Sequence, residues 1–459
     1  MYDTAQDYAA FETTLAGEAA DFFPSGATVH VARAPGRLDV MGGIADYSGS
    51  LVAEMPIEQA AMVGALVGGT GENTVVVRSL NAKAEGLTEE VSLPAEVFIN
   101  PVSLLKYLRE HPPEAHWVGY VAGCFSLLRA EGLIPRGVGA KLLLNSTVPL
   151  GAGVSSSAAV EVASMRALCA AFSVALDGLE MAKLCQRVEN DVMDAPCGIM
   201  DQVTATLGEA GKLLLLLCQP AELRGFAELP PDWCAFGLDS GHKHSVAGNA
   251  YIRVRVAAFM GYKILSDAAK SGFGGYLGNV TPDDYRRIVA NLPGGALPDR
   301  ITGAEFLARH SGIFDTVTTV DPNETYLVRA ATEHPIFEHE RVRDFVERIR
   351  VGDADPDAFA AAGQRMYEAH QSYTDCGIGS TETDLLVELA REQEGVAGAK
   401  ITGGGSGGTV CILCRADREA AVTEAIRNAY FRRTGIPARL IRGTSPGSLA
   451  TPIRTLPIR

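Results

Sequence analysis

A loop at residues 149–159, Pro-Leu-Gly-Ala-Gly-Val-Ser-Ser-Ser-Ala-Ala, carries the residue types that hold phosphate. Glycine lets a backbone turn tightly and approach a ligand, and serine is a typical helix-start residue. We therefore expect a helix that runs from this loop to about Phe172. The free amide groups at the N-terminus of such a helix bind phosphate. Alone, the pattern also fits an ordinary helix cap. It is not a Walker loop, because no Gly-Lys-Ser/Thr follows. The predicted nucleotide-binding residues are Gly151, Ala152, Gly153, Ser155, Ser156 and Ser157.

A second polar group follows the predicted strand at residues 28–33, which we expect to end in a turn at Pro35-Gly36. Arg37 comes directly after this turn, and Asp46 stands in the glycine-rich stretch beyond it. An arginine at a strand end can stabilise charge on a transferring phosphoryl group. An aspartate can accept hydrogen bonds from two sugar hydroxyls at once. A turn with solvated charges is the alternative for this segment on its own.

Two carboxylates further along the chain suit a magnesium-dependent reaction. Glu189 lies on a predicted helix at 181–193, and Asp201 follows a turn at residues 196–198. Magnesium prefers hard oxygen ligands and keeps several waters, so Glu189 and the Ser157 hydroxyl suffice beside ATP phosphates. Asp201 is then free to orient or deprotonate a substrate hydroxyl. A surface ion pair is the alternative for Glu189.

A fourth segment, residues 403–408, reads Gly-Gly-Gly-Ser-Gly-Gly between two strand-like runs. Only glycine allows such close backbone approach to a ligand or to another loop. A flexible hairpin is the alternative, but a linker would not be flanked by two core strands. We therefore expect this loop to border the site, with Gly404 in contact with the substrate.

The elements that must position these groups alternate between strands and helices without a fixed repeat. This mixture predicts an α+β fold with an N-terminal domain at residues 1–225 and a C-terminal domain at 226–459. A helix is expected within residues 1–22, ahead of the first strand. Residues 270–325 are rich in glycine, proline and aspartate, so we expect irregular structure with short helices there.

The composition excludes several classes of protein. A net charge of −15 argues against a nucleic-acid-binding surface or an anionic-membrane-binding surface. The nine cysteines are scattered, which is typical of reduced thiols, and Cys411 and Cys414 are expected in a strand core rather than at a metal. The first residues predict no signal peptide, and no apolar run of about 18 residues predicts a membrane span. We therefore expect a cytoplasmic protein.

Taken together, these segments resemble the GHMP kinases, the superfamily of galactokinase, homoserine kinase, mevalonate kinase and phosphomevalonate kinase. The likeness extends over nearly the whole chain and is greatest to the galactokinase branch. Segments similar to that branch are residues 196–202, Pro-Cys-Gly-Ile-Met-Asp-Gln, and Lys243-His-Ser245 with residues 251–255, Tyr-Ile-Arg-Val-Arg. The resemblance implies an N-terminal domain like ribosomal protein S5 domain 2, a ferredoxin-like C-terminal domain and a site between them.

The resemblance also implies ATP and Mg2+ as cofactors and assigns roles to single residues. The loop from Gly151 to Ser157 would wrap the ATP phosphates, with Ser157 and Glu189 on magnesium. Asp201 would be the catalytic aspartate that faces the anomeric hydroxyl of a sugar. Arg37 would stabilise the same oxygen and the phosphoryl group.

The same resemblance places residues around the sugar and the base. Asp46 would bind ring hydroxyls and Tyr251 would line the sugar site. Asn81 and Trp117 would border the adenine pocket, with core packing as the alternative for Trp117. We expect the sugar and ATP as small-molecule partners, no nucleic acid or membrane, and a monomer or small homo-oligomer.

The segment that carries Arg37 and Asp46 departs from the galactokinase pattern at positions that contact the sugar in galactokinases. Galactokinases read Gly-Glu-His-Thr-Asp-Tyr, whereas residues 42–47 here read Gly-Gly-Ile-Ala-Asp-Tyr. The glutamate that those enzymes place on the 6-hydroxyl is Gly43 here, and the adjacent histidine is Ile44. A site built to bond a hydroxyl rejects a sugar that lacks it, because its own polar groups stay unpaired. Losing those groups indicates a sugar without a 6-hydroxymethyl group, and L-arabinopyranose is galactopyranose without it.

The activity expected from the sequence is therefore ATP-dependent phosphorylation of the anomeric hydroxyl of L-arabinose, giving β-L-arabinose 1-phosphate. Residues 32–52 also resemble the kinase part of plant L-arabinokinases. The alternatives are a galactokinase that holds the 6-hydroxyl through other residues, a uronate sugar 1-kinase, and a catalytically inactive sugar sensor. Retention of Arg37, Ser157, Glu189 and Asp201 argues against the sensor.

Overall fold

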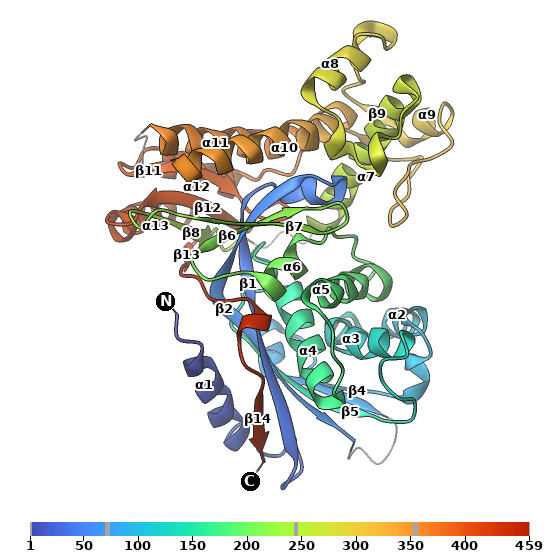
Figure 1. Cartoon of the computed structure of the whole chain (residues 1–459), viewed down its shortest axis with the longest axis vertical. Helices are drawn as coiled ribbons and strands as arrows, with labels where there is room; N and C mark the ends of the chain where they lie inside the picture. Colours follow the sequence, from blue (N-terminus) through green and yellow to red (C-terminus); the bar gives the residue numbers. More distant parts are fainter. Residues whose placement is uncertain (1, 69–73, 243–246, 352–356, 459) are drawn as a thin grey trace.

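Two large sheets and a separate group of helices that includes a two-stranded sheet make up the described part of the chain (Figure 1). The computed structural model describes residues 2–68, 74–242, 247–351 and 357–458. The segment Lys243-His-Ser245, which resembles the galactokinase branch, therefore lies outside the described residues. Both sheets carry packed helices, so the predicted α+β class is confirmed.

The N-terminal sheet is built around two long antiparallel strands, β1 and β2. Its order is β14-β1-β2-β5-β3-β4, and β6 and β7 continue from the other end of β2. β3 and β5 pair in parallel, whereas the other neighbours are antiparallel. The strands are β1 (Thr28–Met41), β2 (Leu51–Val67), β3 (Val75–Ser79), β4 (Glu90–Leu93), β5 (Ala140–Ser146), β6 (Lys212–Leu217), β7 (Glu222–Glu228) and β14 (Arg454–Pro457).

Successive side chains of a strand point to opposite faces of the sheet. On the central strands both sets are apolar, so helices cover both faces of this sheet. Val29 and Val31 pack with Phe11 of α1, whereas Ala32 and Ala34 belong to the main core under α4. The predicted N-terminal helix and the predicted helix after the phosphate loop are confirmed. The helices are α1 (Ala5–Ala16), α2 (Pro101–Arg109), α3 (Val118–Ala130), α4 (Ser156–Phe172), α5 (Gly178–Arg187) and α6 (Met200–Leu207).

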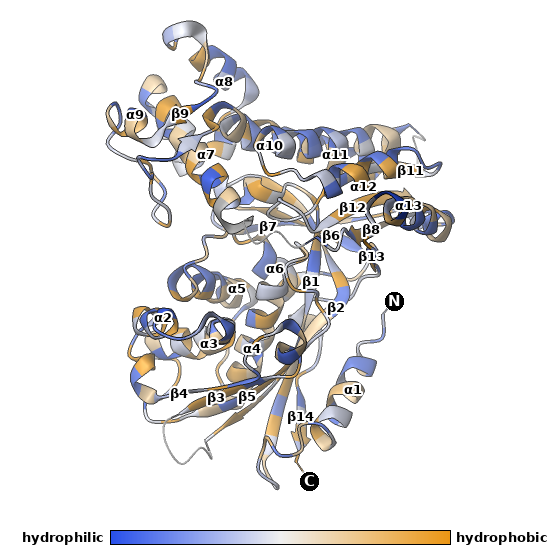
Figure 2. Ribbon diagram, turned by 180° about the vertical axis from the view of Figure 1, so that it is seen from behind, coloured by the Kyte–Doolittle hydropathy of each residue, from blue (hydrophilic) through white to orange (hydrophobic). Residues whose placement is uncertain are grey.

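The C-terminal sheet is antiparallel, in the order β11-β12-β8-β13. Helices α12 and α13 pack on one face through an apolar cluster. Figure 2 shows hydrophilic and hydrophobic residues interleaved along α10 and α11, as expected of helices buried on one side. The elements are β8 (Trp233–Asp239), α10 (Val328–Val351), α11 (Ala358–Asp375), α12 (Thr381–Arg391), β11 (Val396–Ile401), β12 (Thr409–Arg415), α13 (Glu419–Thr434) and β13 (Arg439–Ile441).

The glycine-rich loop joins β11 to β12, so the prediction that two core strands flank it is confirmed. Cys411 and Cys414 are buried free thiols on β12, as expected. The predicted short helices within 270–325 are also present, and with α7 they contribute to an apolar cluster that also includes Ile44 and residues of α10 and α11. These elements are α7 (Ala247–Ala269), α8 (Pro282–Val289), β9 (Ile301–Thr302), α9 (Gly303–Leu307) and β10 (Thr325–Tyr326).

The predicted turn at Pro35-Gly36 is wrong. β1 continues through these residues, with a shift of register between Pro35 and Arg37. Proline is tolerated at such an irregularity because it lacks only a ladder N–H group there. Gly36 lies against the phosphate loop, where an added Cβ would be 2.5 Å from the Val154 carbonyl oxygen. Arg37 therefore projects from a strand rather than from a loop.

The sequence pattern did not predict the last strand, β14. It is short and polar, and it pairs with the first residues of β1, Thr28 to Val31. Figure 1 shows the C-terminus beside the N-terminal sheet, near α1. The chain end therefore returns to the first sheet, while the proposed division at residues 225 and 226 stays a prediction.

Candidate active site

A cavity of about 190 Å³ collects residues from widely separated segments. Pockets for drug-sized ligands occupy about 300–1,000 Å³, so this one suits a smaller molecule. Every residue predicted for catalysis or sugar contact lies in its wall. The lining residues are Arg37, Gly43, Ile44, Asp46, Glu189, Pro196, Cys197, Gly198, Met200, Asp201, Tyr251, Gly403 and Gly404.

Arg37 and Asp201 form an ion pair in this wall. The Nε and Nη2 atoms of Arg37 lie 2.9 and 2.7 Å from Asp201 Oδ1. Both contacts fall on one carboxylate oxygen, which leaves Oδ2 for a hydroxyl in the cavity. Burial alone would lower the pKa of Arg37, but the carboxylates of Asp201 and Glu54 outweigh it and raise that pKa. The pair thus presents a fixed positive charge and a partly exposed carboxylate side by side.

The phosphate loop and the glycine-rich loop meet beside Arg37. Arg37 Nη1 donates to the Gly153 carbonyl oxygen at 2.7 Å, and the Arg37 N–H donates to that of Val154 at 3.1 Å. A Cβ on Gly403 would lie 2.6 Å from the same Gly153 oxygen. Both loops therefore depend on glycine for their close approach, as the sequence predicted.

The serines of the phosphate loop do not cap α4 in the way the sequence predicted. Ser155 adopts a left-handed backbone conformation with φ of 63°, and its side chain makes no capping hydrogen bond. Its hydroxyl oxygen is buried without a hydrogen-bond partner. Without a side-chain cap, the first-turn amide groups of α4 remain for a ligand such as phosphate.

Ser157 instead donates from Oγ to Glu189 Oε1 at 2.9 Å. Glu189 lies on a π-helical turn, Val188–Val192, and also accepts a hydrogen bond from Gln202 Nε2 at 3.1 Å. Burial and the charge of Asp201 raise the pKa of Glu189 to about 7. A cation beside this carboxylate would offset that cost.

The residues fit a magnesium site that is completed by phosphate. Ser157 and Glu189 present two hard oxygens at the N-terminus of α4, and Mg2+ commonly takes one or two protein oxygens with waters and substrate phosphates. In the part of the chain that the structure describes, no group of three or more His, Cys, Asp or Glu side chains suits a metal. A cage made by protein carboxylates alone is therefore not what these residues offer.

Asp46 is a second carboxylate in the cavity wall and is buried. It lies on a 3-10 helix, Gly43–Ser48, and its Oδ1 accepts a hydrogen bond from the Tyr47 N–H at 2.6 Å. Its carboxylate packs so closely on Gly198 that a Cβ there would overlap it. Burial and the charge of Asp201 raise the pKa of Asp46 to about 7. Hydroxyl donors of a ligand would supply the hydrogen bonds that this buried group lacks.

The space beside Gly43 is filled by a tyrosine. Gly43 has a φ of 47°, and a Cβ there would overlap the Tyr373 hydroxyl. Tyr373, on α11, is fully buried; its hydroxyl accepts from the Ile44 N–H and donates to the Gly403 carbonyl oxygen, both at 2.9 Å. Ile44 is 2% exposed within the apolar cluster of the 270–325 segment. Ile44 makes its part of the cavity wall apolar, and Tyr373 leaves no room for a carboxylate side chain at position 43.

A buried ion pair connects the first motif to the strand before the glycine-rich loop. Lys400 Nζ lies 2.7 Å from Asp39 Oδ2, and both side chains are fully buried. Asp39 also accepts hydrogen bonds from the N–H groups of Gly43 and Gly403 at 3.0 and 3.2 Å. One carboxylate thus fixes two backbone segments that line the cavity.

We expect Lys400→Met to lower the free energy of unfolding by about 3–5 kcal/mol, because it leaves the Asp39 charge buried without its partner. The measurement is urea unfolding at pH 7.5. Lys212→Met is the matched control, since Lys212 pairs with Glu209 and Glu228 at the surface, where ion pairs contribute little, and it should leave the stability nearly unchanged. Combining Lys400→Met with Asp39→Asn should recover part of the loss. Equal stability of the two single lysine variants would contradict this account.

Asn81 and Trp117 do not line the cavity. Asn81 Oδ1 accepts a hydrogen bond from the Ser146 N–H at 2.6 Å, at the end of the strand that leads into the phosphate loop. Trp117 Nε1 donates to the Thr88 carbonyl oxygen at 2.9 Å, and its ring packs against the main core. The adenine-pocket role of both residues stays a prediction.

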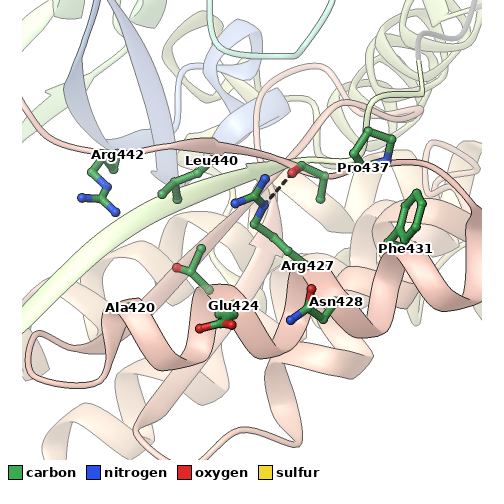
Figure 3. Close-up of a pocket in the computed structure, with 10 residues that line it drawn as sticks. Ala420, Glu424, Arg427, Asn428, Phe431, Pro437, Leu440 and Arg442 are labelled. Carbon is green, nitrogen blue, oxygen red and sulfur yellow. Dashed lines mark hydrogen bonds between the residues drawn. The ribbon is translucent and has the colours of Figure 1, made fainter.

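A larger hollow, of about 620 Å³, lies between α13 and β13 and contains none of the predicted site residues (Figure 3). Arg427 spans it and donates from Nε to the Ala438 carbonyl oxygen at 2.9 Å. Phe431 is 53% exposed at its edge. No buried carboxylate or glycine loop contributes to this hollow, so the chemistry belongs to the smaller cavity.

Sequence reasoning missed several residues that support the site. Glu54 lies 3.3 Å from Arg37 and is fully buried on β2, where burial and Asp39 raise its pKa well above the usual value. Its signal was an acidic residue within the apolar run of residues 51–57, and Lys400 gave a similar signal on β11. Tyr373 gave none, because it stands in an ordinary amphipathic helix.

Comparison with known proteins agrees with this geometry. Residues 119–209 match the GHMP kinases N terminal domain, and residues 355–432 match the GHMP kinases C terminal domain. The galactokinase of Chloroflexus aurantiacus is 30% identical, with coverage of 95% of this chain and 94% of the relative. The chain therefore belongs to the GHMP kinase family, and its sugar kinase relatives identify it as a phosphotransferase with an alcohol group as acceptor.

Within this family, the relatives include both galactokinases and an L-arabinokinase. The L-arabinokinase of Arabidopsis thaliana is 39% identical over 92% of this chain, and the chain spans 46% of the length of that relative. A crystal structure of Lactococcus lactis galactokinase complexed with galactose matches with a TM-score of 0.74, 22% identity, and coverage of 95% of this chain and 98% of that one. This structural likeness confirms the two-domain fold.

Among the described residues, no helix has both the length and the apolar character that crossing a bilayer requires.

Proposed function

We propose that this chain is an ATP- and Mg2+-dependent sugar 1-kinase that phosphorylates the anomeric hydroxyl of L-arabinose to give β-L-arabinose 1-phosphate. Kinase activity is supported by the family and by the Arg37–Asp201 pair beside the phosphate loop. The choice of pentose is carried by one observation: the Tyr373 hydroxyl occupies the space that a side chain at position 43 would need.

The residues divide the reaction between them. Asp46 accepts hydrogen bonds from ring hydroxyls, and Asp201 accepts one from the anomeric hydroxyl and orients it toward the phosphoryl group. Arg37 offsets negative charge as the phosphoryl group moves. The first-turn amide groups of α4 hold the phosphates. Ser157 and Glu189 would hold Mg2+, which would supply positive charge to neutralise the phosphates.

The apolar wall favours a pentose over a hexose. The 6-hydroxyl of galactose, if placed against Ile44 and beside Gly43, would meet no side-chain hydrogen-bond partner from these two residues. An unpaired hydroxyl in an apolar pocket typically changes kcat/KM by about 10- to 100-fold. L-arabinopyranose has no such group and keeps the remaining ring hydroxyls in the same arrangement.

We expect L-arabinose to exceed D-galactose by about 10- to 100-fold in kcat/KM, measured by coupled ADP release with ATP and Mg2+. D-galacturonate should be a still poorer substrate, because its carboxylate would lie at the same apolar wall. Asp201→Ala serves as the control for contaminating kinases. Equal or better turnover of D-galactose would replace the pentose assignment with galactokinase, and absence of ADP release with every sugar, despite sugar binding, would indicate a sensor.

A further inference from the structure

The 270–325 segment, to which the sequence assigned no function, packs against the back of the proposed sugar site. The Tyr276 ring lies so close to Gly49 that a Cβ on Gly49 would overlap it. A Cβ on Gly278 would lie 3.0 Å from the Gly49 carbonyl oxygen. Ile44, in the cavity wall, shares an apolar cluster with Leu277 of this segment. The segment therefore supports the 3-10 helix that carries Asp46.

A buried ion pair between Arg255 and Asp315 joins the segment to helix α7. Asp315 accepts two hydrogen bonds from Arg255, from Nε to Oδ2 at 2.7 Å and from Nη2 to Oδ1 at 3.0 Å. Thr318 Oγ1 adds a third at 2.6 Å. The two charged side chains are 6% and 4% exposed. Such a two-point pair fixes the plane and direction of a guanidinium as well as its charge.

Arg255 transmits this orientation to the cavity wall. Its remaining Nη1 donates to the Cys197 carbonyl oxygen at 3.1 Å, and Cys197 lines the cavity. The next residue, Gly198, packs directly on the Asp46 carboxylate. On its other side the guanidinium lies 5.3 Å from the centre of the Tyr47 ring, and the Tyr47 N–H holds Asp46 Oδ1.

We propose that Asp315 is a positioning residue for the sugar site, acting through Arg255 and the 196–198 loop to hold the Asp46 carboxylate where sugar hydroxyls meet it. This inference rests on the proposed function, in which Asp46 binds the sugar. Asp315 does not line the cavity, so its removal changes the placement of binding groups rather than a contact with substrate. The phosphate loop lies on other elements and should keep its affinity for ATP.

The test compares Asp315→Asn with a matched control in the same segment. Glu324→Gln breaks the ion pair between Glu324 and Arg253, which joins the same helix to the same segment at 3.6 Å but is about half-exposed and does not line the cavity. Asp315→Asn should raise the KM for L-arabinose about tenfold, with kcat within about threefold and the KM for ATP unchanged. Glu324→Gln should change none of the three. Arg255→Lys, which keeps the charge and loses the two-point geometry, should also raise the sugar KM.

The outcomes separate this inference from the proposed function. If the unaltered chain phosphorylates neither L-arabinose nor D-galactose, the proposed function fails. If it phosphorylates either sugar and Asp315→Asn leaves that sugar's KM unchanged, or raises the KM for ATP equally, the positioning role is overturned. Should Asp315→Asn prevent folding, Thr318→Val removes only one hydrogen bond to Asp315 and must still raise the sugar KM measurably without changing the KM for ATP.

Discussion

Asp201→Asn is expected to lower kcat by about 10²- to 10⁴-fold, the range that a positioned proton acceptor contributes. The substitution keeps the shape of the side chain, so Arg37 retains an oxygen to which it can donate. It removes the negative charge that accepts a hydrogen bond from the anomeric hydroxyl and orients it. Single-turnover measurements with excess enzyme would report the chemical step, and titration calorimetry would show sugar affinity within about tenfold of the unaltered chain.

Asp191→Asn is the matched control for Asp201→Asn. Asp191 lies on the π-helical turn that carries Glu189, but its carboxylate is 43% exposed and pairs with Arg187 at 3.3 Å. Removing that surface charge should leave kcat unchanged within about twofold. Retention of full activity by Asp201→Asn would instead assign the proton acceptor to another group and make Asp201 dispensable.

Local sequence patterns predicted the elements whose stability is local. The run of small residues after the phosphate loop became α4, and the apolar runs flanking the glycine-rich loop became β11 and β12. The prediction of a turn at Pro35-Gly36 was wrong because proline and glycine occur both in turns and at strand irregularities. Only the packing of Gly36 against Val154 decides between a turn and an irregular strand here. The strand β14 was not predicted because a four-residue edge strand has too few apolar residues to show the alternating pattern of a strand.

The residues of the candidate site also divide into those that local sequence predicted and those that depend on contacts across the fold. Arg37, Asp46, Glu189 and Asp201 were predicted from their types and motifs, and one cavity holds them all. Their supports depend on pairings across the fold that no local pattern records. Asp39 meets Lys400 across 361 residues of sequence, and Arg255 meets Asp315 across 60. Such partners are recognisable from sequence only as charged residues in apolar surroundings, without an indication of which partner each will find.

The second large effect is expected at Asp46, where stability and binding oppose each other. The pKa of Asp46 is raised to about 7 from an ordinary value of 3.8 by burial and by Asp201, while the Tyr47 N–H, Arg255 and Arg37 lower it by smaller amounts. A carboxyl group with a raised folded-state pKa contributes stability that is complete below about pH 4 and is lost as the pH rises through about 7. At pH 8 the ligand-free protein therefore holds an ionised, buried Asp46 at a cost, and the sugar hydroxyls offset that cost when they bind.

Asp46→Asn should accordingly raise the free energy of unfolding of the ligand-free protein at pH 8 by an amount on the order of 2 kcal/mol, with a rise in Tm, and the gain should shrink toward pH 4. The same variant should lose about 10²- to 10³-fold in sugar affinity, because two hydrogen bonds to a charged acceptor become weaker or unmade. Asp283→Asn, at a side chain that is 94% exposed, is the control and should change neither property. Thermal unfolding from pH 4 to 8 and sugar titration decide the matter. A variant that is less stable than the unaltered chain at pH 8, yet still binds sugar, would show that the buried carboxylate serves the fold rather than the substrate.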